Sequence, residues 1–354
     1  MSGGLIDGPS EIAIVGDRFM RAARFVDALT QACGENPIVC RTLELPWPDE
    51  PMNHGSVERG TDGLRELQGD PDRIVEHIGE ASVFVSHLAP LSRAMLERLP
   101  SLQLVAVSRG GPVNIDLVAA RDAGVTVVNT PGRNASAVAE FTLGAILAET
   151  RNIARGHEAL RRGEWRGDLY RADVQRDELS RLVVGVIGYG EIGTRVVRLL
   201  RAFGSEVLVA DPYRELSDED RAAGVRAVGL DELLAVSDVV TLHARVTDET
   251  RGFMDAQAFA RMRAGTVFVN TARGPLVDYA ALHDALASGH LGGAMLETFA
   301  VEPTPADLPL LSLPNVTLTP HIAGASLTTV RVATERVAEE VRRHLAGEPP
   351  ANPC

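Results

Sequence analysis

Three polar residues with complementary chemistry follow apolar segments in the second half of the chain. Arg273 follows T-V-F-V-N-T-A, Glu302 comes shortly after G-A-M-L-E, and His321 follows V-T-L-T-P. An arginine can bind a carboxylate in a bidentate manner, and a histidine can give or take the proton of a hydroxyl that becomes a carbonyl. A nearby carboxylate orients the imidazole and raises its pKa. Together these residues predict hydride and proton exchange at a substrate that carries a carboxylate and a hydroxyl that becomes a carbonyl.

A glycine-rich motif predicts the source of the hydride. Gly188, Gly190 and Gly193 form G-x-G-x-x-G directly after an apolar strand, and Asp211 ends the next strand. The tight turn, the close approach of a pyrophosphate and the following helix N-terminus bind a dinucleotide, while the acid accepts hydrogen bonds from the adenosine ribose. Taken singly, an arginine or a histidine at such a position is usually a surface or loop residue. Behind this motif, the functional interpretation of all three polar residues together is favoured.

Alternating strands and helices must position these residues. Six strands are expected in the second half, the number of a complete dinucleotide-binding fold. They are Val183–Ile187, Val207–Ala210, Val239–His243, Thr266–Asn270, Gly293–Glu297 and Val316–Thr319. Ligands of an open parallel sheet bind at the carboxyl ends of its strands. We therefore expect the three polar residues to face the crevice that holds the cofactor.

The first part of the chain predicts another parallel sheet. Its expected strands are Glu11–Asp17, Ser82–Ser86, Leu102–Val107 and Thr126–Asn129, with a loop at Pro46–Gly60. The last amphipathic helix, Leu327–Leu345, has no strand of its own and is expected to return to this domain. The prediction is an α/β protein of two doubly wound parallel-sheet domains with a cleft between them. Residues 1–130 and 324–354 would form the substrate domain, and residues 131–323 the inserted dinucleotide-binding Rossmann domain.

Composition narrows the partners. The 354 residues carry a net charge of −13, which disfavours nucleic acid, and no apolar run is long enough for a membrane span. Residues 1–10 lack the basic start and apolar core of a signal peptide, so a cytoplasmic protein is expected. The cysteines show no metal-ligand spacing and fit a reducing compartment, and no metal site is expected. An anionic substrate would need a locally positive pocket.

Several motifs resemble the signatures of the D-isomer-specific 2-hydroxyacid dehydrogenases, over about Ser82 to Val341. They are N-T-A-R-G-P-L-V-D (Asn270–Asp278), F-A-V-E-P (Phe299–Pro303), T-P-H-I-A-G (Thr319–Gly324), V-V-N-T-P-G (Val127–Gly132), A-E-F-T (Ala139–Thr142) and H-A-R-V-T-D-E-T-R-G (His243–Gly252). The resemblance implies that Arg273, Glu302 and His321 form the catalytic set. It also implies a flavodoxin-like substrate domain and, from Asp211, NAD rather than NADP.

The resemblance extends to binding residues and assembly. Cofactor-binding positions are expected at Gly188, Gly190, Glu191, Ile192, Gly193, Asp211, His243, Ala244, Arg245, Thr250, Thr271, Ala272, Glu297 and Gly324. Substrate-binding positions are expected at Arg109, Gly110, Gly111 and His87. Arg109 either adds a positive group for a phosphate or second acid, or only braces its loop. A homodimer is implied through a helix at Ser136–Arg155 and a charged arm at Arg161–Arg181.

Three departures from the family pattern affect the cofactor and substrate sites. Glu297 stands where the family usually has Asp, Arg245 where it has Pro, and the loop Arg109–Asp116 lacks the first Asp of G-x-G-x-D-N-I-D. The leading hypothesis is an NAD-dependent dehydrogenase or reductase of a D-2-hydroxy acid. An alternative is an NAD-gated, co-repressor-like interaction protein with weak turnover. Formate dehydrogenase is disfavoured because it needs Gln at the position of Glu302.

Overall fold

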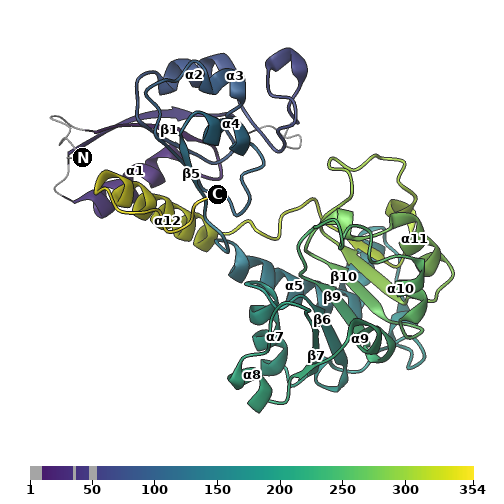
Figure 1. Cartoon of the computed structure of the whole chain (residues 1–354). Helices are drawn as coiled ribbons and strands as arrows, with labels where there is room; N and C mark the ends of the chain where they lie inside the picture. The colour runs from purple at the N-terminus through teal and green to yellow at the C-terminus, as the bar shows by residue number, and fades with distance from the viewer. Residues whose placement is uncertain (1–9, 35–36, 48–53) are drawn as a thin grey trace. The chain divides into compact units, whose positions relative to one another are not determined.

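The chain divides into two compact units (Figure 1). The structure, a computed structural model, describes residues 10–34, 37–47 and 54–354. Unit 1 comprises residues 1–133 and 326–354, and unit 2 comprises residues 134–325. The sequence predicts that the two domains divide after residues 130 and 323, whereas the units of the structure divide after residues 133 and 325. Residues 1–9, and residues 48–53 of the expected loop, lie outside the described residues.

Unit 1 is built on a five-stranded parallel sheet with the order β2-β1-β3-β4-β5. Its strands are β1 (Ser10–Gly16), β2 (Ile38–Glu44), β3 (Val83–Ser86), β4 (Leu104–Val107) and β5 (Thr126–Val128). This is the order of flavodoxin-like folds. The sequence prediction missed β2, because this edge strand is half exposed and carries polar residues such as Arg41 among its apolar ones.

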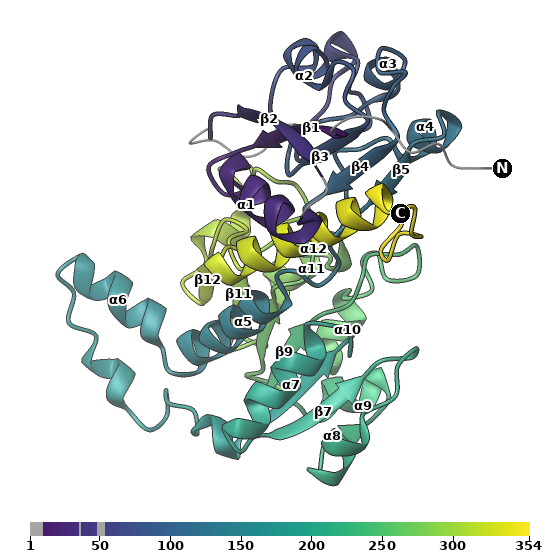
Figure 2. The same ribbon diagram turned by 90° about the vertical axis from the view of Figure 1, so that its left-hand side faces the viewer.

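Helices cover both faces of the unit 1 sheet because its buried strands alternate their side chains between two apolar cores. Ile12 and Ile14 face α1 (Ala22–Cys33) and α12 (Leu327–Leu345). The opposite face packs against α2 (Pro71–Ile78), α3 (Arg93–Leu96) and α4 (Leu117–Asp122). Figure 2 shows α1 and α12 lying side by side on one face. The last helix therefore does return to the N-terminal sheet.

Helix α12 has both the cap and the stripe that its fold requires. The Ser326 hydroxyl accepts a hydrogen bond from the backbone N–H of Thr329 at 3.0 Å, which satisfies a free donor of the first turn. Val330, Val337 and Val341 recur at helical spacing and are buried in the core that α12 shares with α1. The amphipathic pattern of this segment was thus a reliable guide.

Unit 2 contains a seven-stranded parallel sheet with the order β12-β11-β10-β9-β6-β7-β8. Its strands are β6 (Val183–Ile187), β7 (Glu206–Ala210), β8 (Arg226–Ala227), β9 (Val239–Leu242), β10 (Val267–Asn270), β11 (Gly293–Leu296) and β12 (Val316–Leu318). The direction of progression reverses between β6 and β9, as in a Rossmann fold. The expectation of six strands is wrong by one, because β8 is a two-residue, exposed edge strand without an apolar pattern.

Two helical layers enclose the unit 2 sheet. Helices α5 (Ala135–Thr150) and α7 (Gly193–Ala202) cover one face, where they pack against apolar side chains of β6 and β7. The other face packs against α9 (Leu230–Val236), α10 (Ala256–Arg261) and α11 (Tyr279–Ala287). A short helix, α8 (Asp218–Ala222), lies near β7 (Figure 2).

The single helix expected at Ser136–Arg155 is two helices. Helix α5 ends at Thr150, and α6 spans Ile153–Arg161, because Asn152 adopts a left-handed conformation with a φ of 55°. Asparagine tolerates this conformation better than most residues. Helix α6 projects away from the unit 2 sheet (Figure 2), and the chain returns to the unit 2 core at Leu179. Among the described residues, no helix is both long and apolar enough to cross a membrane.

Candidate active site

The loops after β10, β11 and β12 carry the three candidate catalytic residues of unit 2. Arg273 lies three positions past β10, Glu302 six past β11 and His321 three past β12. The first two loops touch through Gly274, where an added Cβ would lie 1.9 Å from the backbone carbon of Phe299. Only glycine permits this contact, so Gly274 sets the spacing between the Arg273 loop and the Glu302 loop.

His321 and Glu302 form a direct pair. The imidazole Nδ1 lies 2.7 Å from Glu302 Oε2, and both side chains are 30% exposed. The other carboxylate oxygen, Oε1, accepts a hydrogen bond from the backbone N–H of Phe299 at 2.7 Å. His321 has a φ of 54°, and its N–H donates to the carbonyl oxygen of Glu297 at 2.9 Å. The carboxylate is thus held on both oxygens and fixes the ring orientation through Nδ1.

Opposing effects act on the His321 pKa, and the net result is a raised value. Burial is the largest effect and lowers the pKa, but the hydrogen bond and charge of Glu302 and the charge of Glu297 raise it. The guanidinium of Arg273 lowers it, so this cation is within electrostatic reach of the ring. Arg273 itself is exposed, and its Nη1 donates to the Ala272 carbonyl oxygen at 2.8 Å. The arrangement combines a proton donor with an accessible cation.

Glu297 binds the loop that follows His321. Its Oε1 accepts a hydrogen bond from the backbone N–H of Ala323 at 2.7 Å, and the residue is 1% exposed. Burial raises the pKa of the Glu297 carboxyl. Gly324, the next residue, packs against Asn134, whose Nδ2 would lie 2.8 Å from an added Cβ. The glutamate that departs from the family pattern is therefore anchored between β11 and the loop after β12.

The glycine motif has the backbone geometry that a dinucleotide requires. Gly188 has a φ of 97°, and a Cβ there would lie 2.7 Å from the carbonyl of His243. A Cβ on Gly190, in contrast, would meet no protein atom within 4 Å, so space remains above this part of the loop. Helix α7 begins at Gly193 and directs its N-terminus to the same loop.

Asp211 is held at the end of β7 beside this loop. Its Oδ2 accepts from the backbone N–H of Tyr189 at 2.7 Å, and its Oδ1 from the N–H groups of Tyr213 and Arg214 at 2.8 and 3.0 Å. These bonds couple the carboxylate to the glycine-rich turn. Glu191 and Ile192, in the same turn, lie between Gly190 and the start of α7.

The remaining candidate cofactor residues follow β9 and β10. His243 Nε2 lies 3.0 Å from the Thr241 hydroxyl, while Nδ1 is buried without a partner among the described residues. Burial lowers its pKa to about 3, so the ring is neutral. Thr250 closes the next loop by donating to the Arg245 carbonyl at 2.6 Å. Ala244 is half-buried, and Arg245 is exposed.

Two further candidates lie at the end of β10. The Thr271 hydroxyl is 2.8 Å from that of Thr142 in α5, and both residues are buried. Ala272 is also buried, and its N–H donates to the Asn270 side chain at 3.0 Å. The A-E-F-T motif of the sequence thus supports the strand end that precedes Arg273.

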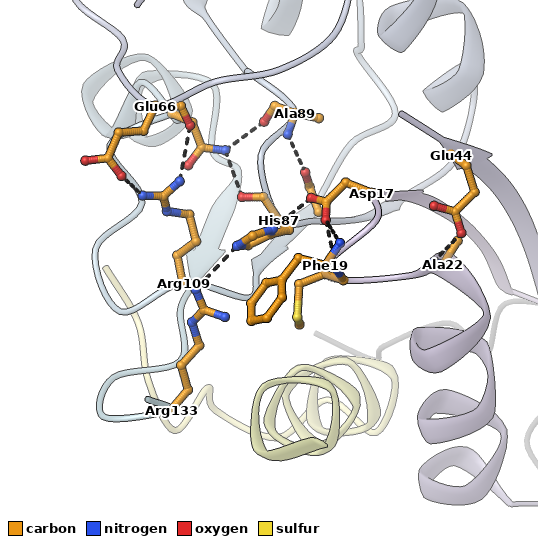
Figure 3. Close-up of polar contacts among 12 residues, drawn as sticks. Asp17, Phe19, Ala22, Glu44, Glu66, His87, Ala89, Arg109 and Arg133 are labelled. Carbon is orange, nitrogen blue, oxygen red and sulfur yellow. Dashed lines mark hydrogen bonds and ion pairs between the residues drawn. The ribbon is translucent and has the colours of Figure 1, made fainter. Parts of the chain in front are cut away.

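Unit 1 has its own polar cluster at the carboxyl ends of its strands (Figure 3). His87, after β3, places Nδ1 2.7 Å from Asp17 Oδ2, and both side chains are buried. Its Nε2 lies 3.3 Å from an Nη2 donor of Arg133, which follows β5. Burial lowers the pKa of His87 to about 4. The ring is therefore neutral, and it donates to Asp17 and accepts from Arg133.

The other substrate candidates lie after β4. Arg109 is ion-paired with Glu66, and its Nη1 donates to the Glu66 carbonyl at 3.1 Å. This favours the alternative in which Arg109 braces its loop. Gly110 and Gly111 are exposed. Asp17 and Arg133 were not expected from the sequence, because no local motif marks them and only the strand order brings them to His87.

Comparison with known proteins identifies the family. Residues 143–323 match the model of the D-isomer specific 2-hydroxyacid dehydrogenase NAD-binding domain. A glyoxylate reductase of Korarchaeum cryptofilum is 35% identical over 280 residues, which cover 79% of this chain and 84% of the relative. The chain belongs to the D-isomer specific 2-hydroxyacid dehydrogenase family.

Other family relatives are longer or more distant. The D-3-phosphoglycerate dehydrogenase of Mycobacterium tuberculosis is 38% identical over 282 residues, covering 79% of this chain but 52% of the relative. The chain thus spans about half the length of these mycobacterial dehydrogenases. A crystal structure of a Thermus thermophilus protein matches with a TM-score of 0.77 at 28% identity, covering 96% of this chain and 99% of that one.

The residues of unit 2 fit the NAD that the family uses. The open space at Gly190, the buried and unpartnered Nδ1 of His243 and the anchored carboxylate of Asp211 lie at the strand ends where a Rossmann fold binds its dinucleotide. Among the described residues, no group of three or more His, Cys, Asp or Glu side chains is arranged to hold a metal ion. The family assignment and the local geometry therefore point to the same cofactor.

Proposed function

We propose that this family member uses NAD(H) to interconvert a 2-oxo acid and a D-2-hydroxy acid. The observation that carries the proposal is the His321–Glu302 pair at 2.7 Å, with the cation of Arg273 in electrostatic reach. In reduction, the 2-oxo acid takes up a hydride and a proton and becomes the hydroxy acid. Relatives named as glyoxylate reductase and D-3-phosphoglycerate dehydrogenase support this reaction class.

The protein residues divide the work of the reaction. Arg273 binds the substrate carboxylate and carbonyl oxygen, and so holds the carbonyl carbon in place. His321 donates the proton from Nε2 to the carbonyl oxygen as negative charge develops there. Glu302 keeps the imidazole oriented and favours its charged form. In the opposite direction, neutral His321 takes the hydroxyl proton.

The cofactor residues complete the proposal. NADH, when bound, supplies the hydride to the carbonyl carbon. The turn Gly188–Gly193 would hold the pyrophosphate, and Asp211 the adenosine ribose hydroxyls. His243 and Glu297 would line the nicotinamide side of the site. Gly110 and Gly111 are the proposed substrate contacts of unit 1, whereas Arg109 braces their loop through Glu66 and His87 bonds to Asp17 and Arg133.

A direct assay tests this function. The purified protein is incubated with NADH and a panel of 2-oxo acids, and loss of NADH absorbance is followed. His321→Ala should lower kcat by roughly 100-fold or more, because general acid catalysis contributes about 10²–10⁴-fold. His283→Ala, on α11, is the matched control and should keep wild-type turnover. Equal turnover in the His321 variant and the wild type would refute the assigned role. No described feature favours the co-repressor alternative.

Assembly as a homodimer is a further part of the proposal. The segment from α6 to residue 181 carries large exposed apolar side chains, with Leu160 59%, Trp165 86% and Tyr170 94% exposed. Aromatic residues of this kind are enriched at protein interfaces. Sedimentation should show a dimer, and Trp165→Glu should shift it toward monomer. A monomeric wild type at micromolar concentration would contradict this.

A cytoplasmic location is also proposed, supported by the free cysteines.

A further inference from the structure

Arg133 carries an unpaired donor at the strand ends of unit 1. It follows β5, and its guanidinium reaches the buried imidazole of His87 (Figure 3). Its Nη1 is buried and has no hydrogen-bond partner among the described residues. Leaving such a donor unpaired in the protein interior is unfavourable, and more so when the group is charged. A buried donor that has no partner in the protein is therefore available to a bound ligand.

The groups around Arg133 orient it without neutralising it. Asp17 Oδ1 accepts from the N–H groups of Phe19 and Met20 at 2.9 and 2.8 Å, and Oδ2 binds His87. Both carboxylate oxygens are thus engaged, and a neutral ring separates them from the guanidinium. The Phe19 ring lies 6.0 Å from Arg133 Cζ, at the outer limit of a cation–π contact. Burial lowers the pKa of Arg133 to about 10, so it stays charged at neutral pH.

Arg109, the other cation of this cluster, has a different environment. Glu66 neutralises it through an ion pair, and the Arg109 side chain is 12% exposed. Its remaining charge acts on Arg133 only by repulsion. Two hydroxyl oxygens on the loops after β4 and β5, those of Ser108 and Thr130, are also buried without a partner among the described residues. Unpaired hydrogen-bonding groups therefore gather at these strand ends.

We propose that Arg133, oriented by the Asp17–His87 pair, binds an anionic group of a small molecule, either a carboxylate or a phosphate. A guanidinium presents parallel donors that match the oxygens of either group. Nη2 is committed to His87, so Nη1 is the donor offered to the ligand. His87 is a positioning residue here, because it acts on the ligand through Arg133.

The ligand class follows if the molecule is the 2-oxo acid, a step that rests on the proposed function. Arg273 is assigned to the carboxylate next to the carbonyl. Arg133 then takes a second anionic group, and the preferred substrates are 2-oxo acids with a further carboxylate or a phosphate. This assigns the second positive group to Arg133 instead of Arg109, for which the sequence left two roles open and whose charge is paired with Glu66.

Substrate preference tests the proposal and identifies the group. NADH oxidation is measured with pyruvate, which has no second anion, with oxaloacetate and with 3-phosphohydroxypyruvate. The wild type should prefer one of the last two over pyruvate in kcat/KM. Arg133→Met should lower that preference by roughly 10- to 100-fold, the value of a charge-assisted hydrogen bond. Arg133→Lys should restore part of it, and His87→Gln should weaken it less than Arg133→Met. The preferred substrate distinguishes carboxylate from phosphate.

A binding measurement separates this proposal from the proposed function. Malonate and inorganic phosphate are titrated calorimetrically into the full-length wild type, Arg133→Met and Arg121→Met. Arg121 lies exposed on α4 and serves as the control. Weaker binding of at least one anion in the Arg133 variant alone supports the proposal even if no 2-oxo acid is reduced. Turnover of pyruvate with no second-anion preference, or equal anion binding in all three proteins, would overturn it.

Discussion

Replacing Glu302 by Gln should move the pH dependence of reduction. The wild-type pKa of His321 is raised above its usual 6.5, mainly because the Glu302 bond and charge outweigh burial. His321 must be protonated to donate, so kcat/KM should be constant below this pKa and fall about tenfold per pH unit above it. Glutamine keeps the shape and an oxygen acceptor but removes the charge. The fall should therefore begin at a lower pH in the variant.

The size of the shift follows from the geometry of the pair. A hydrogen bond between charged groups contributes about 1.5–3 kcal/mol. The two side chains are 2.7 Å apart but 30% exposed, so water screens part of the interaction and the lower end applies. Since about 1.4 kcal/mol corresponds to one pH unit, the alkaline limb should move down by about one unit.

The assay is a kcat/KM profile for reduction between pH 5 and pH 10 at saturating NADH. Asp307→Asn, an exposed acid in the same loop, is the control for a general change in charge. Its alkaline limb should coincide with that of the wild type. An unmoved limb in Glu302→Gln, or equal shifts in the two variants, would refute the role of the pair in setting the His321 pKa.

Four further substitutions probe unit 2. Gly188→Ala should destabilise the protein by about 1–3 kcal/mol in urea unfolding, because of its positive φ and close backbone contact, whereas Gly190→Ala should leave stability within about 0.5 kcal/mol and weaken NADH binding. Asp211→Asn should weaken NADH binding about tenfold and NADPH binding much less, measured by nucleotide fluorescence; equal losses would contradict its ribose role. Glu297→Gln should be more stable than wild type at pH 8, by on the order of 1 kcal/mol, because the raised pKa shows that the fold disfavours the charged form. That gain should vanish as pH falls through the raised pKa, and a gain that grows toward pH 5 would exclude the explanation.

Local sequence patterns predicted the candidate site residues that lie at the ends of strands. The glycine turn, Asp211 and the His321–Glu302 pair each follow an apolar strand, so their place on a parallel sheet could be read from the sequence. Strands β2 and β8 could not be predicted from the sequence, because exposed edge strands lack a continuous run of apolar residues. The break between α5 and α6 at Asn152 was also not predicted, because the helical periodicity of the sequence continues across it.

The cluster in unit 1 shows a different limit. Asp17, His87 and Arg133 are separated by 70 and 46 positions, and they meet because β1 pairs with β3 and the chain returns through β5. The spacing of these residues along the chain does not predict that their side chains are in contact. Likewise, whether Arg109 is available to a ligand depends on Glu66, which lies 43 positions away. Partners of this kind become visible only when the fold is known.

The division of unit 1 between both ends of the chain has a consequence for biosynthesis. Helix α12 completes one of its two apolar cores, yet the 192 residues of unit 2, 134–325, are made between β5 and that helix. At about 5–20 residues per second, the ribosome needs roughly 10–40 s for this stretch. During that time Ile12, Ile14 and Val85 await their covering helix, while unit 2 emerges as one continuous segment. We therefore expect unit 2 to fold first and the nascent N-terminal sheet to be the part that chaperones protect.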